Sequence, residues 1–202
     1  MAMEVVRGDE AGLARAALIV RGGGLVVYPT ETLYGLGADA LDAAAVERLL
    51  ESKGRGADQP VPVLVADRAM LLRVVEGLSP LAEVLIASHW PGPLTLVLPA
   101  RPGLPHALVN TRGGVGVRIS SDPVASALVR EVGGPLTATS ANRKGEAPPI
   151  LADQVSLDGV ALVLDAGERN QQASTVVELL PGLGPRILRQ GTIAPRLPDP
   201  GE

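Results

Sequence analysis

Short apolar runs alternate along the chain with amphipathic segments, and glycine, proline or small polar residues separate them. Runs of about five residues, many of them β-branched, have the length and composition of buried strands. More strands are predicted than a simple alternation of one strand with one helix would supply, so we expect some antiparallel pairs. The pattern therefore predicts an α/β (α+β) fold: a single-domain, twisted, open mixed β-sheet flanked by helices. The expected strands are 25–28, 62–66, 94–98, 115–119, 136–139, 161–165, 175–179 and 186–189.

Capping residues precede the amphipathic segments and predict where the helices begin. Aspartate and serine accept hydrogen bonds from the free amides of a helix N-terminus, and proline is favoured at the first helical position. By this criterion Asp9, Asp42, Ser79 and Asp122 are helix N-caps. The expected helices cover 9–20, 42 to about 52, 67–76, 79–88 and 122 to about 132, and Val46, Leu49 and Leu50 lie on the inner face of the second.

Composition favours one large domain. The chain has 202 residues, 46% of them hydrophobic, but its aromatic residues are only Tyr28, Tyr34 and Trp90. The core must therefore consist of valine, leucine, isoleucine and alanine, as in sheets buried on both faces. No internal repeat or long linker divides the chain, so we expect one domain over 1–194 and a frayed, proline-rich tail over 195–202.

Net charge and missing motifs exclude several classes of protein. The formal charge of -4 argues against a broad nucleic-acid surface, although a local basic pocket remains possible. Cysteine is absent, which excludes disulfides and thiolate metal sites. The sequence has no signal-peptide pattern and no apolar run long enough to span a bilayer, so we expect no membrane association and a cytoplasmic location.

The common nucleotide and hydrolase motifs are absent too. There is neither a P-loop nor a GxGxxG fingerprint, so phosphates would have to be held by side chains. His89 and His106 are the only histidines and no GxSxG elbow accompanies them, so neither a hydrolase triad nor a zinc centre is favoured. We expect no metal site built by the chain itself.

Two polar tripeptides indicate where anion chemistry could lie. In Lys53-Gly54-Arg55 and Ser140-Ala141-Asn142 the polar side chains are two residues apart, so in extended backbone both point the same way. Two cations facing a hydroxyl and an amide suit a polyphosphate. Each tripeptide follows the end of a predicted element, where ligands bind in open α/β sheets. Taken alone, each also fits a solvated surface pair or a turn.

The ordered series YPTETLYGLGADA, SKGR, WPGPLTLVLP, VGVR, TSAN, STVVE and ILRQG resembles the threonylcarbamoyl-AMP synthases of the YrdC/Sua5 family. The resemblance runs from about Arg15 to Thr192 and implies a YrdC-like fold of the short form, without the additional C-terminal Sua5 domain. It implies a nucleotidyltransferase that joins L-threonine, bicarbonate or CO2, and ATP into threonylcarbamoyl-AMP and pyrophosphate, with Mg²⁺ carried by the nucleotide. The product would pass to a separate tRNA threonylcarbamoyl transferase complex for threonylcarbamoyladenosine (t6A) modification of tRNA.

The resemblance also implies roles for individual residues. Lys53, Arg55, Ser140 and Asn142 match the catalytic set around the phosphates and the carbamoyl group. Further ATP contacts are expected from Gln59, Pro148 and Arg189, and threonine contacts from Thr32, Arg118 and Ser174, with Arg118 suited to a bidentate grip on a carboxylate. The chain departs from the common pattern at Gly56, Gln59, Leu64, Ser120 and Gln190, which bears mainly on the threonine side.

Two other functions remain open at this point. One is a paralogue of the same fold with a different carbamoylated acceptor. The other is a non-catalytic RNA-binding module, which the acidic balance and scarce aromatic residues disfavour because single strands are usually held by stacking platforms. A weak contact with RNA also remains open for the enzyme itself. A charge at a helix end contributes only about 0.3 to 1 kcal/mol, so we expect Lys53→Ala to abolish adenylate formation with little effect on stability.

Overall fold

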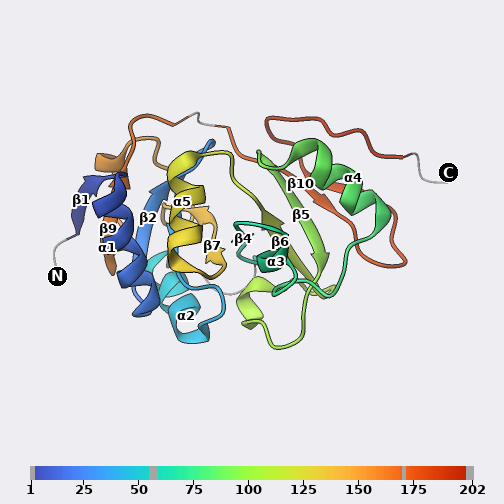
Figure 1. Ribbon diagram of the computed structural model, residues 1–202, viewed down its shortest axis with the longest axis horizontal. Coiled ribbons are helices and arrows are strands. Elements are labelled where there is room, and N and C mark those ends of the chain that lie inside the picture. Colours follow the sequence, from blue (N-terminus) through green and yellow to red (C-terminus); the bar gives the residue numbers. More distant parts are fainter. Residues whose placement is uncertain (1–2, 55–58, 170–171, 199–202) are drawn as a thin grey trace.

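The computed structural model describes residues 3–54, 59–169 and 172–198 of the chain. Within these residues the strands form two mixed sheets, one of five strands and one of six. Figure 1 shows the two sheets side by side, with helices α1 and α5 packed together over strands of the first. The predicted α/β class is confirmed, and its strands are divided between two sheets rather than gathered in one.

The first sheet has the order β1-β9-β2-β3-β8. Its three strands β1, β9 and β2 run parallel, whereas β3 is antiparallel to both β2 and β8. Strand β2 is buried along its whole length. The strands span Glu4–Arg7 (β1), Leu25–Pro29 (β2), Tyr34–Gly37 (β3), Thr139–Ser140 (β8) and Val160–Asp165 (β9).

The second sheet has the order β11-β10-β5-β6-β4-β7. Parallel pairs β10–β5 and β6–β4 alternate with antiparallel pairs, as predicted for a mixed sheet. The strands span Val63–Leu64 (β4), Leu94–Pro99 (β5), Gly114–Arg118 (β6), Leu136–Thr137 (β7), Thr175–Glu178 (β10) and Arg186–Arg189 (β11).

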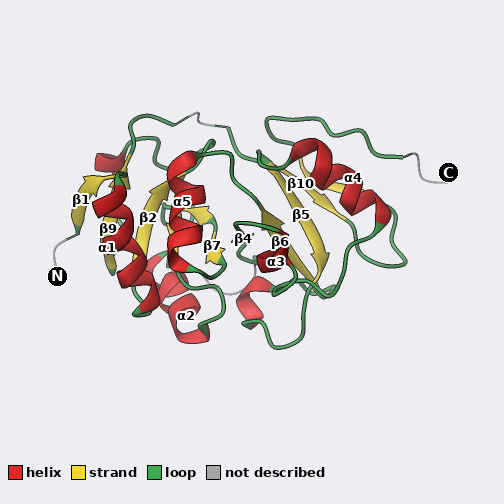
Figure 2. Ribbon diagram, in the orientation of Figure 1, coloured by secondary structure: helices red, strands yellow, loops and turns green. Residues whose placement is uncertain are grey.

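The predicted N-caps lie where the helices begin. The Asp9 carboxylate accepts from the amide of Gly12, Asp42 from Ala44, Ser79 from Ala82, and Asp122 from both Val124 and Ala125. Figure 2 shows α1 and α5 over the first sheet and α4 next to the strands of the second. The helices span Glu10–Arg21 (α1), Ala43–Ser52 (α2), Arg68–Leu71 (α3), Pro80–His89 (α4) and Pro123–Val132 (α5).

Two element predictions were wrong in extent. The helix predicted over 67–76 ends at Leu71, because Val75 and Glu76 leave it to pair with the end of β5: Val75 bridges Ala100, and the Glu76 amide donates to the Pro99 carbonyl at 3.0 Å. The strand predicted over 62–66 is regular only at Val63–Leu64. Strands β1 and β3 were not predicted at all.

The strand predicted over 136–139 is divided between the two sheets. Leu136 and Thr137 pair with β4 in the second sheet, whereas Thr139 and Ser140 pair with β3 in the first. The fully buried Thr137 hydroxyl donates to Leu36 O at 3.1 Å and accepts from Ala38 N at 2.8 Å. This short segment therefore joins the sheets, and it carries Ser140 to their junction.

The core is aliphatic, as the composition predicts, apart from two fully buried tyrosines, Tyr28 and Tyr34. Tyr28 is fully buried on β2, and its hydroxyl donates to Thr137 O at 2.8 Å. The ring lies over the glycines of β3: a Cβ added to Gly37 would lie 2.8 Å from Tyr28 Cε1. The glycines of the YGLG segment thus make room for a tyrosine, and burial raises the pKa of that tyrosine.

None of the described helices combines the length and apolar character needed to cross a membrane.

Candidate active site

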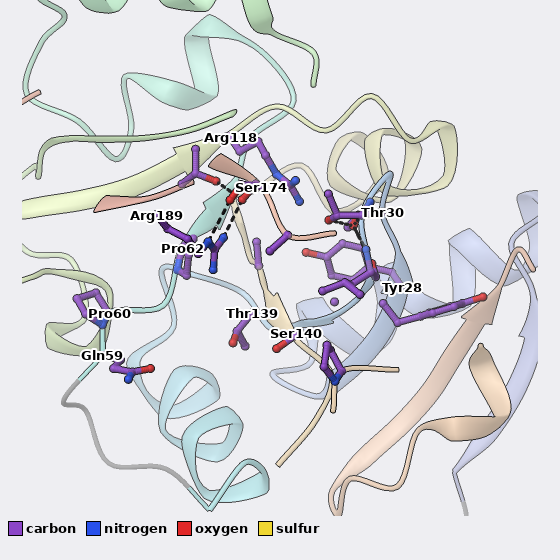
Figure 3. Close-up of a pocket in the computed structure, with 18 residues that line it drawn as sticks. Tyr28, Thr30, Gln59, Pro60, Pro62, Arg118, Thr139, Ser140, Ser174 and Arg189 are labelled. Atoms are coloured by element: carbon purple, nitrogen blue, oxygen red, sulfur yellow. Dashed lines mark hydrogen bonds between the residues drawn. The ribbon is translucent and has the colours of Figure 1, made fainter. Parts of the chain in front are cut away.

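A cavity of about 390 Å³ lies at the junction of the two sheets. The β2–β3 turn and β8 of the first sheet line it together with β5, β6 and β11 of the second. Figure 3 shows Arg118, Ser174 and Arg189 gathered on one side of the cavity and Thr139 and Ser140 on another. Of the predicted site residues, Thr32, Gln59, Arg118, Ser140, Pro148, Ser174 and Arg189 line it.

Lys53 joins the two polar tripeptides behind the cavity wall. It caps the C-terminus of α2 and is only 3% exposed. Its ammonium donates to the carbonyl oxygen of Ser140 and, at 2.6 Å, to that of Asn142. The two tripeptides, 87 residues apart in sequence, are therefore in direct contact. Arg55 lies outside the described residues.

The amide side chain of Asn142 folds over its own loop. Its Nδ2 donates to Arg143 O at 3.0 Å and to Glu146 O at 2.8 Å. Its Oδ1 is buried and has no hydrogen-bond partner within the described part of the chain. Asn142 does not line the cavity, unlike Ser140, so its predicted contact with the nucleotide would require the loop to present Oδ1 or its backbone.

Arg118 reaches the cavity from the end of β6, but it is not free to turn. Its guanidinium is buried and donates from Nη1 to Glu31 Oε1 at 2.9 Å. The other oxygen of Glu31 accepts from the Ser120 hydroxyl, so the departure at Ser120 supplies a partner for this carboxylate. Glu31 was not among the predicted site residues. The ion pair holds the Arg118 guanidinium in place at the cavity wall.

Arg189 and Ser174 form a second basic group on the same side of the cavity. Arg189 donates from Nε to Ser174 O and from Nη2 to Ser174 Oγ, each at 3.0 Å. The Ser174 hydroxyl also lies 3.0 Å from the Thr95 hydroxyl. Partial burial, with a smaller contribution from the charge of Arg118, lowers the pKa of Arg189. Two guanidiniums thus act on one region of the cavity.

The turn between β2 and β3 positions Thr32. The Thr30 hydroxyl donates to Leu33 O at 2.7 Å and accepts from the amides of Thr32 and Leu33. The Thr30 and Thr32 hydroxyls lie 2.9 Å apart. This turn places Thr32, which was predicted to contact threonine, in the cavity wall.

Gly191 packs against the segment that carries Ser174, directly before β10. A Cβ added at Gly191 would lie 2.2 Å from Ala173 O and 2.5 Å from Thr175 N. Backbone cannot yield to such contacts without separating the two segments, and overpacking typically costs about 1 to 3 kcal/mol. We expect Gly191→Ala to lower the unfolding free energy by about 2 kcal/mol and to reduce ligand binding in the cavity, as measured by denaturant unfolding and calorimetry.

Gly184→Ala is the matched control for that substitution, because a Cβ at Gly184 would meet nothing within 4 Å. Equal stability of the two variants would contradict the close packing at Gly191.

Several lining residues were not among the predicted site residues. Tyr28 and Thr95 lie within apolar runs and have the pattern of strand residues, and Thr30 follows such a run directly. Only the pairing of β5 with β10, which sets Thr95 beside Val176, brings its hydroxyl next to Ser174. Together the lining offers guanidinium groups, hydroxyls and a nearby buried ammonium, a set suited to an anionic ligand with several oxygen atoms.

A family model matches residues 18–191: Sua5/YciO/YrdC, described as telomere recombination. This chain belongs to the Sua5/YciO/YrdC family. A relative from Mycobacterium tuberculosis (strain CDC 1551 / Oshkosh), named putative threonylcarbamoyl-AMP synthase, is 43% identical over 186 residues, 91% of this chain and 85% of the relative. The threonylcarbamoyl-AMP synthase of Pyrococcus abyssi is 39% identical over 91% of this chain and 55% of its own length.

Solved structures of the family share the fold. The crystal structure of P. abyssi Sua5 complexed with L-threonine has a TM-score of 0.88 at 36% identity, and the match covers 95% of this chain and 58% of the Sua5 chain. E. coli YciO has a TM-score of 0.82 at 26% identity and matches 94% of this chain and 95% of its own. This chain therefore spans just over half of the P. abyssi chain and nearly the full length of YciO.

Proposed function

We propose that this chain is an L-threonylcarbamoyladenylate synthase, a nucleotidyltransferase acting in t6A modification of tRNA. The proposal rests on one arrangement: the buried Lys53 ammonium fixes the Ser140–Asn142 loop at one wall of a cavity whose other side carries Arg118 and Arg189. A cavity with cationic groups near two walls fits a triphosphate beside an amino-acid carboxylate. The names of the M. tuberculosis and P. abyssi relatives support the same activity.

The reaction needs alignment and charge neutralisation more than a covalent nucleophile. The threonine amine adds to CO2 and loses a proton, which gives a carbamate. A carbamate oxygen then attacks the α-phosphorus of ATP, the bond to the β-phosphate oxygen breaks, and pyrophosphate leaves. Fixed donors that meet the charge developing on phosphate oxygens stabilise such a transition state, and holding the reactants in line removes much of the entropic barrier.

We assign the nucleotide to the wall formed by Ser140 and Pro148 with Gln59, where Lys53 lies directly behind the loop. Arg189 and the undescribed Arg55 would complete the phosphate contacts, and Mg²⁺ would enter as part of the MgATP substrate. Threonine would lie toward Thr32, Arg118 and Ser174. In this arrangement the amine faces the centre of the cavity, where CO2 and the α-phosphate meet.

The product is a mixed anhydride of a carbamate and a phosphate, which makes its carbamoyl group a strong acylating agent. Such a product needs an acceptor, and we propose that it passes to a tRNA transferase in a separate complex in the cytoplasm.

One assay tests the proposed function. The protein is incubated with MgATP, bicarbonate and one amino acid at a time, pyrophosphate is measured, and the adenylate is identified by mass spectrometry. Threonine-dependent pyrophosphate release with formation of threonylcarbamoyl-AMP is the expected result. Dependence on another acceptor would show a paralogue, and tight RNA binding without pyrophosphate release would show a non-catalytic module.

A further inference from the structure

Thr95 is a buried residue of the cavity wall with no role assigned above. It lies on β5, next to the strand β10 that follows Ser174, and only 3% of its surface is exposed. A Cβ added to Gly116 of the neighbouring strand β6 would lie 3.4 Å from Thr95 Cγ2, so the methyl group packs against that glycine. The hydroxyl is directed the other way, toward Ser174 Oγ at 3.0 Å.

The hydrogen bonds of the two hydroxyls leave one proton over. Arg189 is a donor only, so Ser174 Oγ accepts from its Nη2. One of the two hydroxyl protons occupies the bond between Ser174 and Thr95. Within the described residues neither hydroxyl has another acceptor. Both residues line the cavity, so the second proton can be donated to a ligand there.

The need to satisfy both oxygens decides which hydroxyl holds that proton. If Thr95 donated to Ser174, Ser174 would accept twice and the buried Thr95 oxygen would accept nothing. If Ser174 donates to Thr95, each oxygen accepts once, and the Thr95 proton is the one left to donate into the cavity. A series of hydrogen bonds then runs from the Arg189 cation through Ser174 to Thr95, and each hydrogen bond polarises the next.

We propose that Thr95 is a substrate-binding residue and that its hydroxyl donates to a carboxylate oxygen of the amino-acid substrate. The nearby charges of Arg118 and Arg189 favour an anionic acceptor at this position. The inference rests on the proposed function, because it takes threonine as the occupant of this side. It differs from the family-based assignment in making Ser174 a positioning residue that acts through Thr95.

The test is calorimetric titration of threonine and, separately, of MgATP into the purified protein and its variants. Thr95→Val removes the hydroxyl at nearly constant volume. Because hydrogen bonds to charged groups are the stronger class, we expect threonine binding to weaken about tenfold or more and ATP binding to stay within twofold. Ser174→Ala keeps the terminal donor and should weaken threonine binding less than Thr95→Val does, while Thr95→Ser should restore it.

Two controls keep the outcome interpretable. Thr111→Val makes the same chemical change at an exposed position and should leave both affinities unchanged. If Thr95→Val fails to fold, Thr95→Ser and Thr95→Ala form the comparison, since both lose the methyl group and only the hydroxyl distinguishes them.

Unchanged threonine affinity in Thr95→Val, or a larger loss in Ser174→Ala, would overturn the inference. A loss confined to ATP binding would overturn it as well, by placing the hydroxyl on the nucleotide. Failure of the unaltered protein to bind threonine would contradict the proposed function itself, and it would be seen before any variant is made.

Discussion

Lys53→Ala is expected to reduce adenylate formation by at least a hundredfold and to lower the unfolding free energy by about 2 to 3 kcal/mol. The first effect follows from losing an ammonium that fixes the Ser140–Asn142 loop, which forms the wall where we propose that the phosphates bind. The second follows because two backbone carbonyls lose a charged donor in a buried place. Pyrophosphate release with saturating substrates and denaturant unfolding measure the two effects.

The sequence alone predicted little effect of this substitution on stability, because it treated Lys53 as an exposed charge at a helix end. Arg130, an exposed cation in the last turn of α5, has that situation and is the matched control. Arg130→Ala should change stability by less than about 1 kcal/mol and leave turnover unaltered. Turnover within tenfold of the unaltered protein in Lys53→Ala would show that Lys53 is not part of the site.

Arg118→Lys is expected to raise the KM for threonine about a hundredfold while the KM for ATP changes little. Lysine keeps the charge and so still neutralises Glu31. Its compact ammonium lacks the planar fork of arginine, so it cannot present two parallel donors to a substrate carboxylate while it pairs with Glu31. The bidentate grip is lost, and a carboxylate must find other donors. Steady-state kinetics with one substrate varied at a time separates the two KM values.

Arg112→Lys is a useful comparison for this variant. Arg112 also pairs with a buried glutamate, Glu178, at 3.1 Å, but it is exposed and does not line the cavity. Arg112→Lys should therefore leave both KM values unaltered. A matched rise in the KM for ATP in Arg118→Lys would place Arg118 on the nucleotide instead of the amino acid.

Local sequence features predicted the parts of the site that lie at element ends. The helix caps and the polar tripeptides are decided by neighbouring residues. Of these the structure places Ser140 in the cavity wall and Lys53 behind it, and Arg118 at the end of a strand also lines the cavity. The resemblance added Ser174, Arg189 and Pro148, which no local rule would single out. All three line the cavity.

The remaining features depend on contacts between distant segments. In the sequence, Glu31 is only one polar residue of a turn. Its role depends on Arg118, which lies 87 residues further along the chain and is brought to it by β6. Strand β3 was missed because its glycines, unfavourable in strands, are required by the Tyr28 ring on β2. The division of 136–140 between two sheets depends on which partners are present, β4 or β3, and nothing within those five residues encodes it.

The passage of the chain through Thr137 from one sheet to the other means that neither sheet can form the cavity alone. Its walls come from strands far apart in sequence, and such distant pairings are the slow steps in folding. A refolding molecule would therefore complete most of its secondary structure before it can hold a ligand. Recovery of threonine or nucleotide binding should thus mark the last stage of assembly.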